Sequence, residues 1–154
     1  MINNVSATLD NNRESAKANV CLFRCSPRDL PFSIKLLERH LYSTQMFIPM
    51  TADKRYLVIV AQGGDKPGNH FPHNHNSQQD LSTLKAFVAS KSQGITYYPG
   101  TWHHPMIALD NVTGSFFHLH CVLNLDFTCV VYEDGSQDDC HVEQLDDVIT
   151  CYVN

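Results

Sequence analysis

The stretch ITYYPGTWHHPMIAL, residues 95–109, has the pattern of two short strands separated by a tight turn. Aromatic and β-branched residues lie on both sides of a Pro-Gly dipeptide, which is typical of turns. In an extended strand, consecutive side chains leave from opposite faces, so His103 would share a face with Thr101 and His104 with Trp102. The sequence therefore predicts that the two adjacent histidines point to opposite sides of one strand.

The rest of the chain repeats this pattern of short apolar segments separated by clusters of Gly, Pro, Asn and Asp. The first twenty residues are polar and lack a sustained period, which predicts a coil or an arm. Strands are expected in NVCLFRC (19–25), PFSIKLLERH (31–40), TQMFIPM (44–50), RYLVIVAQGG (55–64), FFHLHCVL (116–123), FTCVVYE (127–133) and ITCYV (149–153).

One segment has the features of a helix. DLSTLKAFVAS, residues 80–90, begins with Asp80 as a candidate N-cap, and Leu81, Leu84 and Val88 form a loose apolar stripe at helical spacing. Many short strands with so little helix point to an antiparallel β-barrel or sandwich. A chain of 154 residues is long enough for one such domain.

Composition excludes several classes of function. A net charge of −5 argues against nucleic-acid binding, which needs a clustered basic face. No window approaches the roughly 20 apolar residues of a membrane span, and the polar N-terminus lacks the apolar core of a signal peptide. The six cysteines are scattered and form no CxxC pair, which favours reduced thiols. We therefore expect a cytoplasmic protein.

Three groups of histidines are candidates for chemistry. His70, His73 and His75 lie in a stretch rich in Asn, Gly and Pro, which indicates a surface loop with metal binding as the less favoured alternative. His118 and His120 would share one face of a strand, a spacing that suits metal ligands but is also common on a barrel face. The third group is the adjacent pair within residues 95–109.

The segment around Trp102 has two interpretations that the residues alone leave open. Aromatic side chains, a turn and two imidazoles would suit a pocket for a small polar ligand. The alternative is a core tryptophan beside one buried and one exposed histidine. Elsewhere, residues 38–40 would form an ordinary strand end with a surface ion pair, and Gln45 is either an edge residue or a donor to a ligand.

Four segments, taken in order, resemble the ureidoglycolate lyase family, whose members are also called ureidoglycolate hydrolases. They are LLERHLYSTQMFIPM, YLVIVAQGGDKP, DLSTLKAFVASKSQGITYYPGTWHHPM and DCHVEQL. The resemblance implies one domain over residues 1–154 that folds as a cupin-like antiparallel β-barrel with one or two short helices. It also implies a homodimer that cleaves (S)-ureidoglycolate to glyoxylate and urea in allantoin and purine degradation.

The chain departs from the family pattern in several places. It lacks an N-terminal segment that members usually have, and the resemblance is interrupted near residues 68–79 and 114–124, which we interpret as insertions. His118 and His120 would then be additional residues. Tyr98 and Pro99 stand where many members have His and Arg.

The resemblance implies a proton-transfer site at the adjacent pair His103 and His104. Collapse of ureidoglycolate needs a base for its hydroxyl and an acid for the departing urea nitrogen, and histidine suits both roles. We expect His103 or His104 to be the base and the other to orient it, with Tyr97 as a further catalytic residue. Arg39 and His40 would bind the substrate carboxylate.

Other residues would complete this site. Gln45, together with Tyr97, would hydrogen-bond the ureido group, Trp102 would exclude water, and Glu38 would orient Arg39. A divalent metal, nickel or manganese, is a candidate cofactor with His40, His103 and His104 as ligands. The alternatives are an amidohydrolase that releases ammonia and a catalytically silent cupin-type protein that binds a small carboxylate.

Overall fold

The computed structural model describes residues 13–50, 55–63, 79–90, 93–109 and 124–152. These residues form strands almost throughout. The elements are β1 (Lys17–Cys25), β2 (Phe32–Arg39), β3 (Gln45–Pro49), β4 (Arg55–Gly63), β5 (Gln79–Ser90), β6 (Ile95–Tyr97), β7 (Trp102–His103), β8 (Ile107–Ala108), β9 (Leu125–Glu133), the 3-10 helix η1 (Gln137–Asp139) and β10 (His141–Cys151).

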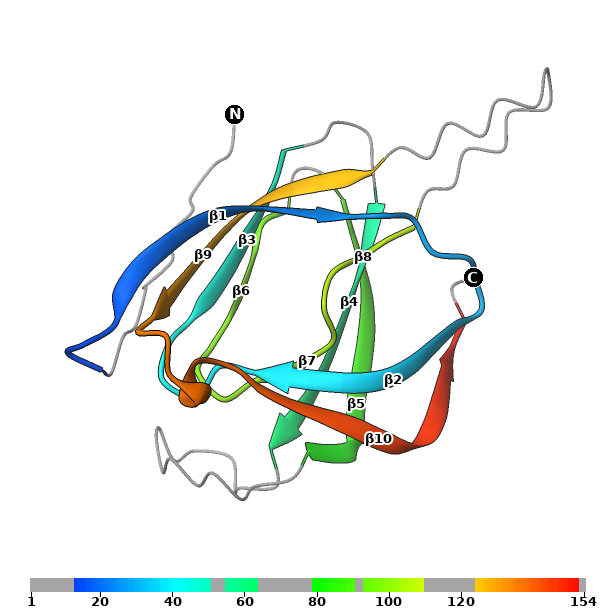
Figure 1. The fold of residues 1–154 in the computed structure, drawn as a ribbon. Coiled ribbons are helices and arrows are strands. Elements are labelled where there is room, and N and C mark those ends of the chain that lie inside the picture. The colour runs from blue at the N-terminus through cyan, green and yellow to red at the C-terminus, as the bar shows by residue number, and fades with distance from the viewer. Residues whose placement is uncertain (1–12, 51–54, 64–78, 91–92, 110–123, 153–154) are drawn as a thin grey trace.

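The strands form two curled antiparallel sheets that face each other, as in a cupin-like barrel (Figure 1). One sheet has the order β1-β9-β3-β6, and the other has the order β10-β2-β7-β4-β5, with β8 also paired to β4. The first strand, β1, therefore lies beside the late strand β9, and the last strand, β10, lies beside the early strand β2. Such long-range pairing gathers residues 38, 45, 97 and 103 in one region although they are far apart in sequence.

Two apolar cores stabilise the sheets. The first is built from both sheets and fills the space between them, and the second comes from the larger sheet alone. In β9, the alternation of buried and less buried residues follows the period of two expected for a strand with one face on a core. The first core contains Cys25, Phe47, Tyr56, Val58, Ala89, Tyr97, Met106, Ala108, Leu125, Phe127 and Cys129. The second contains Ile34, Leu37, Leu57, Ile59, Ala61, Trp102, Ile107, Leu109 and Cys151.

The predicted helix over residues 80–90 is wrong, because this segment is strand β5. It pairs with β4 along most of its length, including Val58 opposite Phe87. The apolar stripe at helical spacing does not form one buried face, since Leu81 and Val88 are exposed and Leu84 packs against the second core. Pairing with the edge of β4 satisfies the backbone and overrides the local helical pattern. The only helix in the described part of the chain is the single turn η1.

The other strand predictions within the described residues are confirmed. Some boundaries differ: β1 begins at Lys17, within the stretch expected to be a coil, and the strand expected at residues 149–153 is the end of β10, which begins at His141. The histidine-rich loop at residues 70–75, the His118–His120 strand and both predicted insertions, apart from their edge residues 79 and 124, lie outside the described residues. None of the described segments forms a helix long and apolar enough to cross a membrane.

Candidate active site

The two-residue strand β7 brings His103 to the centre of the candidate site. β7 lies between β2 and β4, where His103 is opposite both Glu38 and Val60. The His103 ring stacks on Tyr97, with 3.8 Å between ring centroids, and is almost fully buried. His104 instead packs edge-on against Phe32 at 5.2 Å. The prediction that the two histidines point to opposite sides of a strand is confirmed.

Glu38, His40 and His103 form a cluster in which both histidines are buried and Glu38 is partly buried. Their ligand atoms, one from each residue, all lie within 4.8 Å of one another. Glu38 Oε1 is 3.5 Å from His103 Nε2, and the two imidazoles are nearly parallel with 6.0 Å between their centroids. A carboxylate and two imidazoles at this spacing are a set that exchanges protons or binds a divalent metal.

Backbone carbonyls set the orientation of both imidazoles. His40 Nδ1 donates to the Asp139 carbonyl oxygen at 2.7 Å, and His103 Nδ1 donates to the Thr101 carbonyl oxygen at 2.8 Å. Each ring therefore turns Nε2 toward the cluster. His40 Nε2 is buried and has no hydrogen-bond partner. A buried nitrogen without a partner is costly in a packed interior, which marks this position as one that a ligand would complete.

Gln45 and Tyr97 complete one side of the cluster. They are opposite each other on β3 and β6. Gln45 Oε1 lies 3.0 Å from His103 Nε2, so a protonated His103 donates to it. The Tyr97 hydroxyl is buried without a hydrogen-bond partner. Together the two side chains offer polar groups that a small polar substrate would satisfy.

Burial and neighbouring charges shift the pKa values of this cluster. Burial raises the pKa of Glu38, but the hydrogen bond from His103 and the charges of three histidines outweigh it, so the pKa lies below its ordinary value. Burial, and then the charge of His103, lowers the pKa of His40. Burial raises the pKa of Tyr97. At neutral pH the site therefore holds a carboxylate, a neutral His40 and a neutral phenol.

Arg39 lies with the second core. Its guanidinium carbon is 4.4 Å from the centre of the Trp102 ring, and its Nη2 is 3.3 Å from His141 Nδ1. Both Arg39 and Trp102 are buried. This arrangement separates Arg39 from Glu38, its neighbour in β2, because adjacent strand residues face opposite sides. The expected orientation of Arg39 by Glu38 is thus replaced by a contact between Glu38 and His103.

The structure also changes the expected set of metal ligands. His40 and His103 lie in the cluster as expected, but the third member is Glu38. His104 Nδ1 contacts the carbonyl oxygen of the next residue, Pro105, at 2.7 Å. Burial lowers the pKa of His104. The physical reason for the exchange is strand alternation, which turns adjacent imidazoles to opposite faces.

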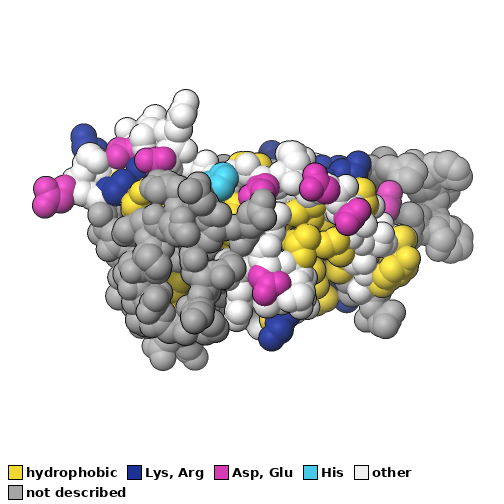
Figure 2. Space-filling model, turned by 90° about the horizontal axis from the view of Figure 1, so that it is seen from below, with side chains coloured by type: hydrophobic (Ala, Val, Ile, Leu, Met, Phe, Trp, Pro, Cys, Tyr) yellow, Lys and Arg dark blue, Asp and Glu magenta, His cyan; other side chains and the backbone are white. Residues whose placement is uncertain are grey.

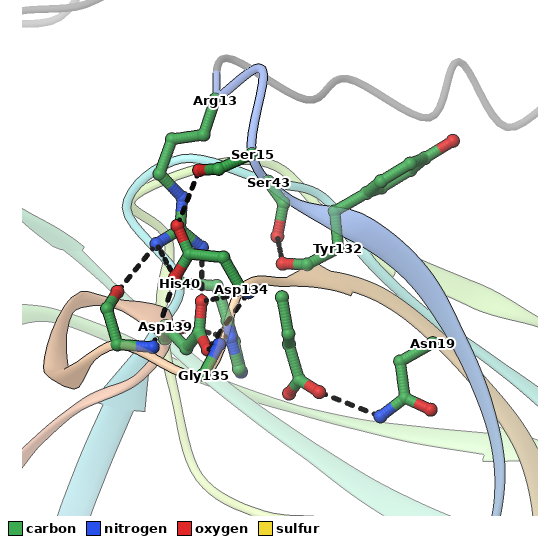
Figure 3. Close-up of polar contacts among 11 residues, drawn as sticks. Arg13, Ser15, Asn19, His40, Ser43, Tyr132, Asp134, Gly135 and Asp139 are labelled. Atoms are coloured by element: carbon green, nitrogen blue, oxygen red, sulfur yellow. Dashed lines mark hydrogen bonds and ion pairs between the residues drawn. The ribbon is translucent and has the colours of Figure 1, made fainter.

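A network centred on Arg13 holds the turn that carries the His40 partner (Figure 3). Arg13 forms ion pairs with Asp139 and Asp134. The Asp139 carboxylate also accepts from the backbone amide of Gly135 at 2.7 Å. The carbonyl of the same Asp139 accepts from His40. An N-terminal residue therefore fixes the acceptor that orients a site imidazole across the molecule.

The lowered pKa of His40 and His104 predicts a loss of stability in mild acid. Below pH 6.5, the ordinary value, an unfolded histidine binds a proton before the buried one does. The free energy of unfolding should therefore fall as the pH decreases through this value. Urea unfolding measured from about pH 7 to about pH 5 tests this prediction. This pH range lies above the ordinary carboxyl pKa, so carboxyl groups contribute little to the change. The double variant His40→Gln, His104→Gln should show a shallower fall; an unchanged slope would contradict the prediction.

Comparison with known proteins shows the family of this chain. The sequence profile of the family described as ureidoglycolate lyase matches residues 2–151. The chain belongs to the ureidoglycolate lyase family. A protein named ureidoglycolate lyase from Burkholderia mallei (strain NCTC 10229) is 42% identical over 107 residues, which cover 70% of this chain and 55% of that protein. One of the same name from Escherichia coli O1:K1 is 34% identical over 139 residues, which cover 90% of this chain and 70% of that protein.

This member of the ureidoglycolate lyase family spans about half the length of its Burkholderia relatives. The family resemblance seen in the sequence is confirmed. Two features of the site escaped sequence reasoning. One is the position of Glu38 beside His103, which follows from the register of β2 and β7. The other is the Asp139 carbonyl, for which no sequence signal exists because every residue has a carbonyl.

Proposed function

We propose that this chain cleaves (S)-ureidoglycolate to glyoxylate and urea. The observation that carries the proposal is the cluster of Glu38, His40 and His103 in a member of the ureidoglycolate lyase family. Ureidoglycolate bears a hydroxyl and a ureido nitrogen on the same carbon. Its collapse needs one proton removed from the hydroxyl and one delivered to the nitrogen, a task for positioned acid–base groups.

In this proposal His103 performs both proton transfers. With Nδ1 held by the Thr101 carbonyl, neutral His103 takes the hydroxyl proton at Nε2. Glu38, 3.5 Å from that nitrogen, stabilises the imidazolium that forms. As the carbon–nitrogen bond breaks, the same proton passes to the departing urea nitrogen. His104, on the other face, is assigned no proton transfer.

The neighbouring polar groups would bind the substrate. Gln45 Oε1 lies 3.0 Å from His103 Nε2, and the Gln45 amide would hydrogen-bond the ureido group as His103 changes protonation. The unpartnered hydroxyl of Tyr97 would donate to a substrate oxygen, since burial keeps this phenol neutral. The Arg39–Trp102 stack would support the wall behind β7 and keep water out. Neutral His40, whose Nδ1 donates to the Asp139 carbonyl, would accept at Nε2 from a substrate hydroxyl or ureido N–H, and Arg39 keeps this supporting role.

The donor set also fits a divalent metal. Both imidazoles donate from Nδ1 to backbone carbonyls, the usual arrangement around metal-binding histidines, and Nε2 faces the carboxylate in each case. Nickel and manganese both accept such nitrogen and oxygen ligands. Glu38, His40 and His103 would hold the ion, which when bound would polarise the substrate hydroxyl.

We also propose that the protein is a cytoplasmic homodimer. The described cysteines are all free thiols, as is usual in a reducing compartment. Hydrophobic side chains are exposed on β5 and β10, among them Phe87 at 53% and Val148 at 59%. Figure 2 shows hydrophobic groups gathered at one end of a face that also carries acidic side chains. Exposed apolar groups of this kind favour burial against a second copy.

Turnover of the substrate tests the proposed activity. Purified protein is mixed with racemic ureidoglycolate, with and without added nickel or manganese, and glyoxylate, urea and ammonia are measured. Glyoxylate and urea in equal amounts, from one enantiomer only, are expected. Ammonia in place of urea would identify an amidohydrolase. The absence of turnover under every metal condition would contradict the proposed activity and favour a carboxylate-binding protein.

The Arg13 network predicts an effect at long range. Replacing Arg13 with alanine frees Asp139, whose carbonyl orients His40, and should lower kcat/KM about tenfold, the size typical for residues that orient a ligand. Arg13→Lys should recover part of the loss. Arg24→Ala is the matched control, since Arg24 pairs with Asp126 on the surface. Equal losses in the Arg13→Ala and Arg24→Ala variants would contradict the prediction.

A further inference from the structure

Two cysteines lie directly opposite each other near the candidate site. Cys21 of β1 and Cys129 of β9 are partners in the antiparallel register of these neighbouring strands (Figure 1). Opposed residues in such a pair have Cα atoms about 4.5 or 5.5 Å apart. A disulfide needs a Cα separation of about 4.4–6.8 Å. The register therefore places the two Cα atoms at a separation that a disulfide can span.

The two thiols differ in access. Cys21 is exposed, whereas Cys129 is only 4% exposed and belongs to the core between the sheets. An exposed thiol next to a buried one is the arrangement in which the first reacts with a reagent from solution and the second resolves the product. The remaining described cysteines, at positions 25, 140 and 151, are not opposite another cysteine in the register of the described strands.

Gln45 connects this pair to the site. On β3, Phe47 is the direct partner of Cys129, and Gln45, two residues earlier, lies on the same face of the sheet. The Gln45 side chain hydrogen-bonds the Cys129 thiol and also contacts His103 Nε2 at 3.0 Å. A change in the chemical state of Cys129 therefore reaches His103 through one buried amide.

We propose that Cys21 and Cys129 form a reversible disulfide by exchange with a low-molecular-weight disulfide, and that this oxidation loosens the contact of Gln45 with His103. The Cys21 thiolate attacks one sulfur of the reagent and releases the other half as a thiolate. Cys129 then loses its proton to solvent and attacks the Cys21 sulfur of the mixed disulfide, releasing the second thiolate. Two protein thiols are oxidised and one reagent disulfide is reduced to two thiols.

The order of these steps agrees with the electrostatics of the pair. Burial, followed by the charge and hydrogen bond of Cys21, raises the pKa of Cys129 to about 12. Once Cys21 is in a mixed disulfide, its charge is removed and the pKa of Cys129 should fall. The Gln45 hydrogen bond lowers the pKa of Cys129, so the amide donates to the sulfur. A disulfide sulfur is only a weak acceptor, and oxidation therefore weakens this contact.

Peptide mapping tests disulfide formation independently of activity. The full chain is incubated with oxidised glutathione, free thiols are alkylated, and unreduced peptides are identified by mass spectrometry. We expect a Cys21–Cys129 cross-link in the wild type and in Cys140→Ser, the control. Cys129→Ser should instead retain glutathione on Cys21. Glutathione that stays on Cys21 in the wild type, or an unmodified Cys21, would overturn the proposal.

The effect on the site rests on the function proposed above and needs a second measurement. Oxidised wild type should lose about three- to tenfold in kcat/KM, the range expected for one hydrogen bond, and recover it with dithiothreitol. Cys21→Ser should keep its activity in both conditions. The ¹H–¹⁵N signals of the His103 ring should shift on oxidation even if no turnover exists. A cross-link without such a shift would refute the coupling, while lack of turnover in reduced protein would refute only the proposed activity.

Discussion

Replacing His103 with alanine is expected to lower kcat/KM for ureidoglycolate by about 10²–10⁴-fold, the usual contribution of a positioned acid–base group. His103 has the contacts that such a group needs. Its Nδ1 is held by the Thr101 carbonyl, and its Nε2 faces Glu38 and Gln45. Alanine keeps the strand but removes the nitrogen that we propose exchanges the proton. Steady-state kinetics with detection of glyoxylate measures the loss.

The neighbouring histidine is the matched control for this variant. His104→Ala removes an imidazole from the next position of the chain, but one that packs on Phe32 and not in the cluster. Its kcat/KM should stay within about tenfold of the wild type, since the group makes none of the proton transfers. If His104→Ala loses as much activity as His103→Ala, or His103→Ala retains it, the assignment of the base to His103 is wrong.

Replacing Trp102 with alanine should lower the free energy of unfolding by about 3–5 kcal/mol. Trp102 is fully buried in the second core, and Arg39 stacks on its ring. The substitution leaves a cavity and exposes a buried guanidinium to it, so both packing and a cation–π contact are lost. Urea unfolding followed by circular dichroism measures the change, because Trp102 is the only tryptophan and its fluorescence disappears.

Tyr152 provides the control for loss of an aromatic side chain. It is 73% exposed, so Tyr152→Ala should change the free energy of unfolding by no more than about 0.5 kcal/mol. Trp102→Phe, which keeps a ring for Arg39, should lie between the two. A Trp102→Ala variant as stable as Tyr152→Ala would show that the second core does not depend on the indole.

Local patterns predicted most of the strands and failed for one segment. In RYLVIVAQGG, a run of β-branched residues ending at glycines predicted β4, which the structure confirms. In DLSTLKAFVAS, leucines and valine at helical spacing predicted a helix, yet the segment is β5. The strand depends on β4, a partner from another part of the chain, and a pattern within eleven residues carries no information about such a partner.

The candidate site, too, was predicted in part from local patterns and decided in part by strand register. Strand alternation alone predicted that His103 and His104 point apart. The family resemblance selected residues 38, 39, 40, 45, 97, 102, 103 and 104 as members of one site. Glu38 and Arg39 are also adjacent strand residues, and strand alternation turns their side chains to opposite faces, although Glu38 was expected to orient Arg39. The register of β2 against β7 instead places Glu38 at His103, and Arg39 stacks on Trp102.

The sequence by itself therefore determined the β class, the family and the residue types of the site, because these follow from side-chain period and from motifs within short segments. Only the tertiary structure decided which carboxylate joins the two imidazoles, which backbone carbonyls orient them, and that Cys21 lies opposite Cys129. Those contacts join positions as much as 108 residues apart, such as Cys21 and Cys129, and depend on strand register. A shift of one residue in register would turn each of these side chains to the other face.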